Sequence, residues 1–229
     1  MVRVAGEHLW VLASVVGVHA ATALAAGLLH RWTLVFVYPI CLAASLAAAA
    51  ADISALLSNV QEAAQLPMGL PGVGLRFRLD ALAGFFGAIV NIGVAAACLY
   101  GLGLDRRTEL SARIEPFVPV FAAAMNLVLL ADDAFAFLFS WELMSLSSWV
   151  LVVSRHHDAD ARHAGHVYLV MAAIGTAALL FAFGGMAGAA GGYAFDQMRG
   201  QKLAPMVAGL VLAATIIGAG SKAGIMPLH

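Results

Sequence analysis

Long apolar runs with almost no charge are the feature that most restricts what this chain can form. A transmembrane helix needs about 20 consecutive, mostly apolar residues, and seven runs of the 229-residue chain approach that length. They are residues 9–29, 32–51, 81–101, 117–131, 134–153, 166–188 and 204–226. The runs are continuous rather than alternating, which excludes the strands of a membrane barrel. The sequence therefore predicts an all-α, polytopic transmembrane bundle of about seven helices.

The composition agrees with a lipid environment. Hydrophobic residues make up 62% of the chain and charged residues 11%, whereas a soluble domain of this length needs more charge to cover its surface. The formal net charge of −1 provides no basic surface for nucleic acid. We therefore expect a multi-pass protein of the cell inner (cytoplasmic) membrane, in contact with the lipid bilayer and not with nucleic acid.

The sequence predicts no cofactor and no resident metal. Cys41 and Cys98 lie inside apolar runs, without a C-x-x-C motif or a neighbouring His/Cys cluster, so we expect them to be small buried side chains. No ligand set for an iron–sulfur cluster, a nickel–iron centre or structural zinc is present. There is also no dinucleotide-binding or phosphate-binding glycine motif. Catalysis is therefore expected on partner subunits rather than in this chain.

One loop, residues 154–165, is rich in histidine. The histidines in and next to it are His156, His157, His163 and His166, with Asp158 and Asp160 among them. A metal site is conceivable, but a solvated loop with incidental histidines is several times more frequent. We favour the solvated loop. A second polar segment, residues 52–80, is also predicted to be a loop.

Glu142 is a charged residue inside the fifth apolar run. It lies eight residues beyond the start of that run, which is about 12 Å at 1.5 Å per residue and close to the midplane of a core about 30 Å thick. A charge at that depth costs about 2.5–3.5 kcal/mol, and such residues are commonly functional. The alternative is a protonated Glu142 that hydrogen-bonds Ser140 or Ser145 and is only structural. We favour the functional interpretation.

Lys222 lies late in the seventh run, within the segment GAGSKAGIMP. Glycines, a serine and a proline around a lysine predict an interrupted helix, and broken helices at membrane depth mark ion pathways. Lys222 could instead extend its ammonium group to the membrane surface. The residues alone leave both interpretations open.

A glutamate and a lysine buried in one bundle influence each other's charge. Desolvation favours the neutral form of each, whereas each favours the charged form of the other. If the two approach, they titrate as a coupled unit, and a nearby charge changes which of them holds the proton. This coupling is what a proton relay requires, and it is also compatible with a structural ion pair.

Two long motifs resemble those of one membrane-protein family. They are FAAAMNLVLLADDAFAFLFSWELMSLSSWVLVV at residues 121–153 and GAGSKAGIMPLH at residues 218–229. RLDALAGFF, at residues 78–86, resembles the start of the third helix in the same family. The family comprises the antiporter-like proton-conducting subunits of respiratory complex I, multisubunit sodium/proton antiporters and membrane-bound hydrogenases. Within it, ELMSLSSW and KAGIMPLH are most similar to the branch of hydrogenase-4 component B and its formate hydrogenlyase counterpart.

That resemblance implies roles for single residues. The family fold contains two inverted five-helix repeats, in which a glutamate of the fifth helix and a lysine of the broken seventh form a coupled pair that drives proton movement. These proton-relay roles fall on Glu142 and Lys222. His229 matches a histidine that follows the helix break, and it and Ser145 are accessory candidates.

The function implied by the resemblance is proton translocation in an energy-converting hydrogenase or an NADH-dehydrogenase-like complex. In such an oxidoreductase complex the redox chemistry takes place on partner subunits. The implied partners are other membrane subunits and a peripheral redox arm of the nickel–iron hydrogenase type. Two alternatives stay open. One is a sodium/proton antiporter or an inorganic-carbon transport component, and the other is a non-conducting membrane anchor or a decayed, truncated gene product.

The chain departs from the family in length, because family members continue through a W-L-P segment, an eighth helix and a second repeat. A truncated product, a split gene or a partial record would each give such a chain. We interpret residues 1–80 as the first two helices and a polar loop. Residues 81–229 are interpreted as the incomplete start of an antiporter-like domain, helices three to seven.

Overall fold

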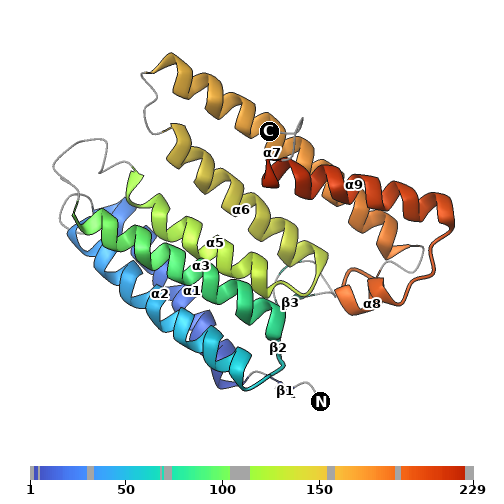
Figure 1. The fold of residues 1–229 in the computed structure, drawn as a ribbon, viewed down its shortest axis with the longest axis horizontal. Helices are drawn as coiled ribbons and strands as arrows, with labels where there is room; N and C mark the ends of the chain where they lie inside the picture. The colour runs from blue at the N-terminus through green and yellow to red at the C-terminus, as the bar shows by residue number, and fades with distance from the viewer. Residues whose placement is uncertain are drawn as a thin grey trace. The chain divides into compact units, whose positions relative to one another are not determined.

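Every one of the seven apolar runs forms a helix in the computed structural model, which describes residues 3–4, 6–29, 34–67, 69, 74–103, 114–153, 158–188 and 192–224. The helices are α1 Glu7–Leu29, α2 Leu34–Leu57, α3 Ala81–Leu102, α5 Phe117–Leu130, α6 Ala134–Val152, α7 Ala159–Ala187, α8 Phe195–Arg199 and α9 Pro205–Ala223 (Figure 1). The short helix α8 is additional to the predicted set. The predicted all-α membrane bundle is thus confirmed.

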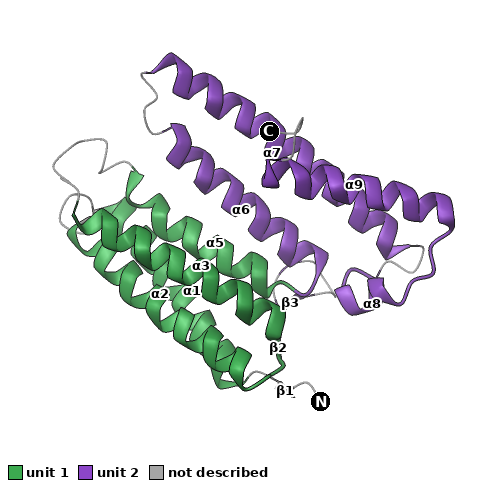
Figure 2. Ribbon diagram, viewed as in Figure 1, with its two compact units in different colours: residues 1–65, 77–131 green, residues 66–76, 132–229 purple. Residues whose placement is uncertain are grey.

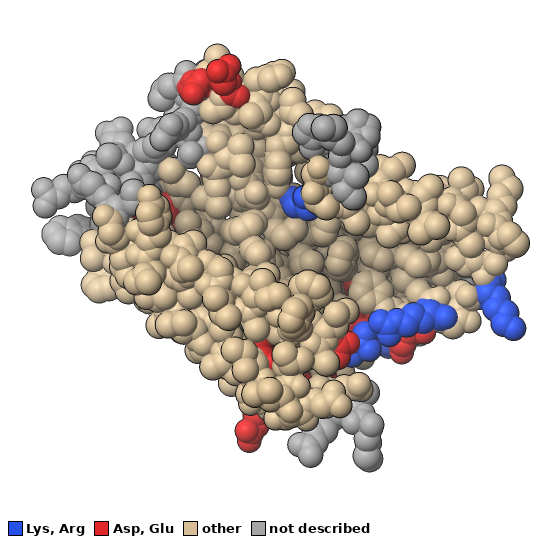
Figure 3. Space-filling view, viewed as in Figure 1, with Lys and Arg blue, Asp and Glu red and all other residues tan. Residues whose placement is uncertain are grey.

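The described helices expose their apolar side chains and bury polar ones. Six of them, all but α5 and α8, are long and apolar enough to cross a membrane. Leu28 and Leu57 are 80% and 81% exposed, whereas His19 and Asn91 are fully buried. The face shown in Figure 3 is mostly uncharged. A surface of this kind suits hydrocarbon rather than water, because exposed apolar area of this extent is rare on soluble monomers.

The chain divides into two compact units, which are coloured separately in Figure 2. Unit 1 comprises Met1–Gln65 and Phe77–Ala131, and unit 2 comprises Leu66–Arg76 and Asp132–His229. These units describe packing. The functional division after residue 80 is a separate matter and stays a prediction.

Unit 1 contains α1, α2, α3 and α5. One of its apolar cores includes Leu12, Ala48 and Leu79. A second core contains Cys41 of α2 and Cys98 of α3, which are free thiols with no exposed surface. The prediction that both cysteines are small buried side chains is confirmed.

The predicted loop at residues 52–80 is partly wrong. Helix α2 continues to Leu57, and short strands follow at β2 Glu62–Leu66 and β3 Leu75–Leu79. With β1 Arg3–Val4 they form a three-stranded sheet of order β1-β2-β3, in which β1 and β2 are parallel. Asp52 does not end α2 because its carboxylate is buried and accepts a hydrogen bond from Asn91 of α3.

Strand β2 contributes a carboxylate that fixes the start of α1. Glu62 is buried. Its Oε2 accepts a 2.7 Å hydrogen bond from the backbone N–H of Leu9, and its Oε1 lies 3.1 Å from Nδ1 of His8. The first N–H groups of a helix have no partner within the helix, and a carboxylate there also interacts favourably with the helix dipole. Glu62 therefore serves as a cap supplied from a distant part of the chain.

Unit 2 contains α6, α7, α8 and α9. Helix α7 begins at Ala159, earlier than the predicted residue 166, because Asp158 caps it by accepting from the N–H of Asp160. His163 and His166 are therefore exposed residues of a helix rather than of a loop. His156 and His157 lie outside the described residues. Among those described, no group of three or more His, Cys, Asp or Glu is arranged to hold a metal ion.

Candidate functional site

Glu142 lies in the middle of α6, on the side that meets α7. Helix α6 has a firm start because Asp133 accepts from the N–H of Ala136 at 2.7 Å. The half-buried Glu142 accepts, through Oε1, a hydrogen bond from the hydroxyl of Thr176 on α7. A membrane-depth carboxyl group is thus held by a side chain that can donate to its charged form or accept from its neutral form.

Lys222 lies in the last turn of α9. Its Nζ donates to Oγ of Ser145 at 2.8 Å and to Oη of Tyr168 at 2.5 Å. The ammonium group is also 4.8 Å from the ring centroid of Tyr168 and 5.9 Å from that of Trp141, both within the range of cation–π attraction. Lys222 therefore turns back onto α6 and α7.

The end of α9 provides a favourable place for that cation. Gly224 has a φ of 67°, the left-handed conformation that glycine adopts without strain, and its N–H bonds the carbonyl of Gly220. A positive charge in the last turn also interacts favourably with the helix dipole. Helix α9 was expected to reach residue 226 with an interruption. Its described part ends at this cap, and His229 lies outside the described residues.

Ser145 bonds Lys222 and lies close to Glu142 in the sequence of α6. It follows Glu142 by three positions on α6, so both side chains lie on one face of the helix. The Ser145 hydroxyl donates to the carbonyl of Trp141 at 2.8 Å and accepts from Lys222. Glu142 and Lys222 are both described, and no ion pair within 4.0 Å joins them. Lys222 is thus bonded to a hydroxyl group that lies one helical turn from Glu142.

Two residues of this site are absent from the sequence prediction. Tyr168 and Thr176 both lie on α7, eight positions apart, where the helix repeat places them on a similar face. They are also among the few hydrogen-bonding side chains of an otherwise apolar run. That spacing is the signal from which a polar stripe facing Glu142 and Lys222 could have been predicted.

Close glycine contacts hold α9 against α7. A methyl group on Gly218 of α9 would lie 2.5 Å from Cγ of Leu179 and 2.9 Å from the carbonyl oxygen of Gly175. Small residues at such crossings let two backbones approach closely. This contact brings the last turn of α9, with Lys222, to Tyr168.

We expect Gly218→Ala to destabilise the protein by about 1–3 kcal/mol, because the added methyl group overpacks the α7–α9 contact. Gly209→Ala is the matched control on the same helix, since nothing lies within 4 Å of its added methyl group. The control should be neutral or slightly stabilising, because alanine favours a helix over glycine by roughly 0.5–1 kcal/mol. Thermal unfolding of both variants in lipid nanodiscs measures the difference. Equal melting temperatures would contradict the close packing.

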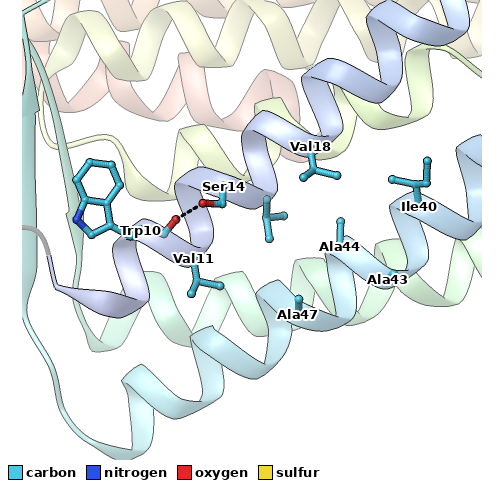
Figure 4. A pocket seen from close by; sticks show the side chains of 9 residues that line it. Trp10, Val11, Ser14, Val18, Ile40, Ala43, Ala44 and Ala47 are labelled. Carbon is cyan, nitrogen blue, oxygen red and sulfur yellow. Dashed lines mark hydrogen bonds between the residues drawn. The ribbon is translucent and has the colours of Figure 1, made fainter.

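An apolar groove of about 560 Å³ lies between α1 and α2 in unit 1. Trp10, Val18, Ile40 and Ala47 are among the nine side chains that line it (Figure 4). Its one hydroxyl, on Ser14, is bonded to the carbonyl of Trp10. None of the nine lining residues is titratable, so the groove is suited to hydrocarbon and not to proton chemistry.

The C-terminal part of the chain matches a known family. Residues 131–229, which include Glu142, Ser145, Tyr168 and Lys222, match the model described as "NADH:quinone oxidoreductase/Mrp antiporter, TM". Residues 131–229 belong to the antiporter-like family of membrane subunits. The resemblance drawn from the sequence motifs is thereby confirmed, and the chain is a multi-pass membrane protein.

Relatives of this antiporter-like subunit share about two thirds of its length. Hydrogenase-4 component B of Escherichia coli (strain K12) is 36% identical over 157 residues, which are 68% of this chain and 23% of that protein. An uncharacterized protein of Mycobacterium tuberculosis (strain ATCC 25618 / H37Rv) is 38% identical over 160 residues, which are 70% of this chain and 25% of that protein. The chain spans about a quarter of the length of these relatives.

Solved structures share the fold of the antiporter-like subunit. A chain of the membrane-bound sulfane sulfur reductase, an archaeal respiratory membrane complex, matches with a TM-score of 0.77 at 15% identity. The match covers 96% of this chain and 46% of that one. A chain of the Mrp complex from Dietzia sp. DQ12-45-1b matches with a TM-score of 0.75 at 21% identity, over 93% of this chain and 23% of that one. At these identities the likeness extends to the fold alone.

Proposed function

We propose that this chain is part of a proton-translocating subunit of an energy-converting complex in the inner (cytoplasmic) membrane. The subunit couples redox chemistry on partner subunits to proton movement, and the partners include a peripheral arm of the nickel–iron hydrogenase type. The similarity to hydrogenase-4 component B supports this choice of complex. Within the chain, residues 81–229 form the start of the conducting domain, and residues 1–80 precede it.

The observation that carries the proposal is the hydrogen bond from Lys222 to Ser145, one helical turn from Glu142 on the same face of α6. The ammonium group donates to two hydroxyl groups, on Ser145 and Tyr168. Each hydroxyl group can accept one hydrogen bond and donate another. A change in the charge of Glu142 alters the electrostatic cost of the Lys222 charge, since the two share a low-dielectric interior.

In this mechanism Glu142 loads a proton while Lys222 is neutral and releases it when Lys222 becomes charged. Thr176 bonds the Glu142 carboxyl in either state, because a hydroxyl both donates and accepts. Tyr168 keeps the Lys222 side chain directed toward α6 by its hydroxyl and its ring. No cofactor takes part in these steps.

The test is Glu142→Gln in the full-length subunit within its native complex. Glutamine keeps the shape and accepts from Thr176, but it binds no proton at this site. We expect redox-driven proton uptake into inverted membrane vesicles to fall about a hundredfold, in line with the 10²–10⁴-fold contribution of positioned proton-transfer groups. Redox turnover with an artificial acceptor measures whether the complex is still assembled.

Glu7→Gln is the matched control, because Glu7 is an exposed glutamate in the first turn of α1. It should leave proton uptake unchanged. If Glu142→Gln also pumps at the control rate while the complex is assembled, the chain is a non-conducting anchor.

A second candidate is a sodium/proton antiporter, which the fold likeness to a chain of the Mrp complex favours. An antiporter would make proton movement depend on a counter-ion even without redox turnover. Replacing all sodium and potassium with choline in the vesicle assay separates the two functions. Proton uptake that persists favours the redox-driven subunit, and uptake that stops favours the antiporter.

A further inference from the structure

Unit 1 contains a buried carboxyl group that the proposed relay does not use. Asp52 of α2 is 2% exposed, and its neighbours Asn91 of α3 and Asn126 of α5 are 0% and 3% exposed. Asp52 is five residues from the end of α2, so it lies about 7.5 Å inside that end. Asn91 lies at the middle of α3, one turn deeper than Gly87, which packs on Asp52. Three helices thus enclose one polar cluster.

Every N–H group of the two side-chain amides in this cluster donates a hydrogen bond. Nδ2 of Asn91 donates to Oδ2 of Asp52 and to Oδ1 of Asn126, both at 2.9 Å. Nδ2 of Asn126 donates back to Oδ1 of Asn91 at 3.1 Å and to the carbonyl of Ala122 at 2.9 Å. Each amide has two hydrogens, and all four are engaged. The paired amides therefore present one fixed N–H group to the carboxyl group.

The helices also leave space for this carboxyl group. A methyl group on Gly87 would lie 2.7 Å from Oδ2 of Asp52 and 2.8 Å from its Oδ1. A methyl group on Gly84, one turn earlier, would lie 3.1 Å from the backbone oxygen of Asp52. A glycine directly opposite the carboxyl is what admits it to the interface of α2 and α3.

We propose that Asp52 is a proton-binding site of this chain, separate from Glu142 and Lys222. Its carboxylate takes up one proton from the aqueous phase to become a carboxylic acid, and it returns that proton. Asn91 serves both states without moving, because its N–H donates to Oδ2 of Asp52 both in the carboxylate and when Oδ2 is the carbonyl oxygen of the acid.

The chemistry of the cluster favours a proton over a metal cation. The atom that faces Oδ2 of Asp52 is an amide nitrogen with its hydrogen, and that positive end repels a cation. The oxygens of Asn91 and Asn126 are engaged in the bond between the two amides. A proton needs no ligand shell, so it fits this arrangement.

No described charge stands beside Asp52 to hold it permanently ionised. The helices packed against α2 are α1, with the titratable side chains Glu7, His8 and His19, and α3, with Cys98 and Tyr100. Helix α5, which packs on α1 and α3, has no titratable side chain. None of these described groups forms a hydrogen bond or ion pair with Asp52. A carboxylate without an opposite charge is costly inside a membrane-spanning helix, so proton uptake relieves a penalty.

The experiment is a pH titration of the full-length subunit in its native complex by infrared difference spectroscopy. The readout is the carbonyl stretch of a protonated carboxylic acid. We expect a band that Asp52→Asn removes, because asparagine keeps the hydrogen bond with Asn91 but has no carboxyl group. Asp80→Asn is the control, since Asp80 is a partly exposed cap of α3 that asparagine replaces well. Spectra of Asp52→Asn that match those of the unchanged protein at every pH would overturn the proposal.

A second pair of variants keeps the test decisive if Asp52→Asn does not assemble. Gly87→Ala crowds the carboxyl group and should shift the band, whereas Gly93→Ala on the same helix meets nothing within 4 Å. A band that neither variant moves belongs to another carboxyl group and refutes the assignment. Glu142→Gln should leave the Asp52 band in place, so failure of the relay and failure of this site are distinguishable.

Discussion

Replacing Lys222 with methionine is expected to lower redox-driven proton transport about a hundredfold without preventing assembly of the complex. Methionine has a similar length and packs well in apolar surroundings, so the α7–α9 contact should persist. It cannot donate to Ser145 or Tyr168, and it carries no charge to influence Glu142. The measurement is the rate of proton uptake into inverted vesicles at a fixed rate of redox turnover.

Arginine at the same position separates a relay from a structural cation. A guanidinium group remains protonated at every accessible pH, whereas a lysine releases its proton readily when buried. If Lys222 only pairs with nearby dipoles, Lys222→Arg should restore most of the transport lost in Lys222→Met. If it cycles between charged and neutral forms, Lys222→Arg should transport as poorly as the methionine variant.

Lys202→Met controls for the general loss of a lysine near α9. Lys202 is exposed and precedes the helix. It should transport at the unchanged rate. Transport by Lys222→Met equal to that of Lys202→Met would remove Lys222 from the proton path.

The continuous apolar runs of the chain were sufficient to predict its helices. Each of the seven runs became a helix, and six of these helices are long and apolar enough to span a membrane, whereas α5 is shorter. The ends were harder to predict. Residue 52 was taken as the start of a loop, yet α2 continues to Leu57, because a partner 39 residues away in sequence satisfies Asp52. A local sequence pattern contains no information about that partner.

The site was predictable only in part. Glu142 and Lys222 stood out because charges are rare in apolar runs. Their surroundings did not, since the bond between Lys222 and Ser145 joins residues 77 positions apart. Tyr168 and Thr176 gave a weaker signal, because hydroxyl groups occur in transmembrane helices without any functional role. The proton-relay roles themselves remain predictions.

Asp133→Ala is expected to cost the protein about 2–6 kcal/mol of stability. Asp133 has no exposed surface. Its Oδ1 accepts from the N–H of Ala136 at 2.7 Å, and its Oδ2 accepts from the N–H of Arg76 at 2.6 Å. Alanine removes the partner of the buried N–H of Ala136 and of the partly buried N–H of Arg76, each at a cost of about 1–3 kcal/mol.

The hydrogen bond from the N–H of Arg76 explains why loss of Asp133 should cost more stability than loss of an ordinary helix cap. Asp133 fixes the start of α6 and also ties it to Arg76, at the end of the segment Leu66–Arg76 that belongs to unit 2. Neighbouring backbone bonds depend on the same arrangement, since the N–H of Asp132 donates to the carbonyl of Arg76 and the N–H of Phe195 to that of Asp132. Loss of the carboxylate should therefore loosen the start of α6 and the start of α8 together.

Asp158→Ala is the comparison that isolates this effect. Asp158 caps α7 through a single 3.0 Å bond to the N–H of Asp160, and it is exposed, so its loss should cost about 1 kcal/mol. The stability loss of Asp133→Asn should fall between those of Asp133→Ala and Asp158→Ala. The one carbonyl oxygen of asparagine can accept from Ala136 or Arg76, but its amide nitrogen cannot accept at all. Thermal unfolding in lipid nanodiscs ranks the three variants. If Asp133→Ala melts at the same temperature as Asp158→Ala, the bond to Arg76 contributes nothing and Asp133 is an ordinary helix cap.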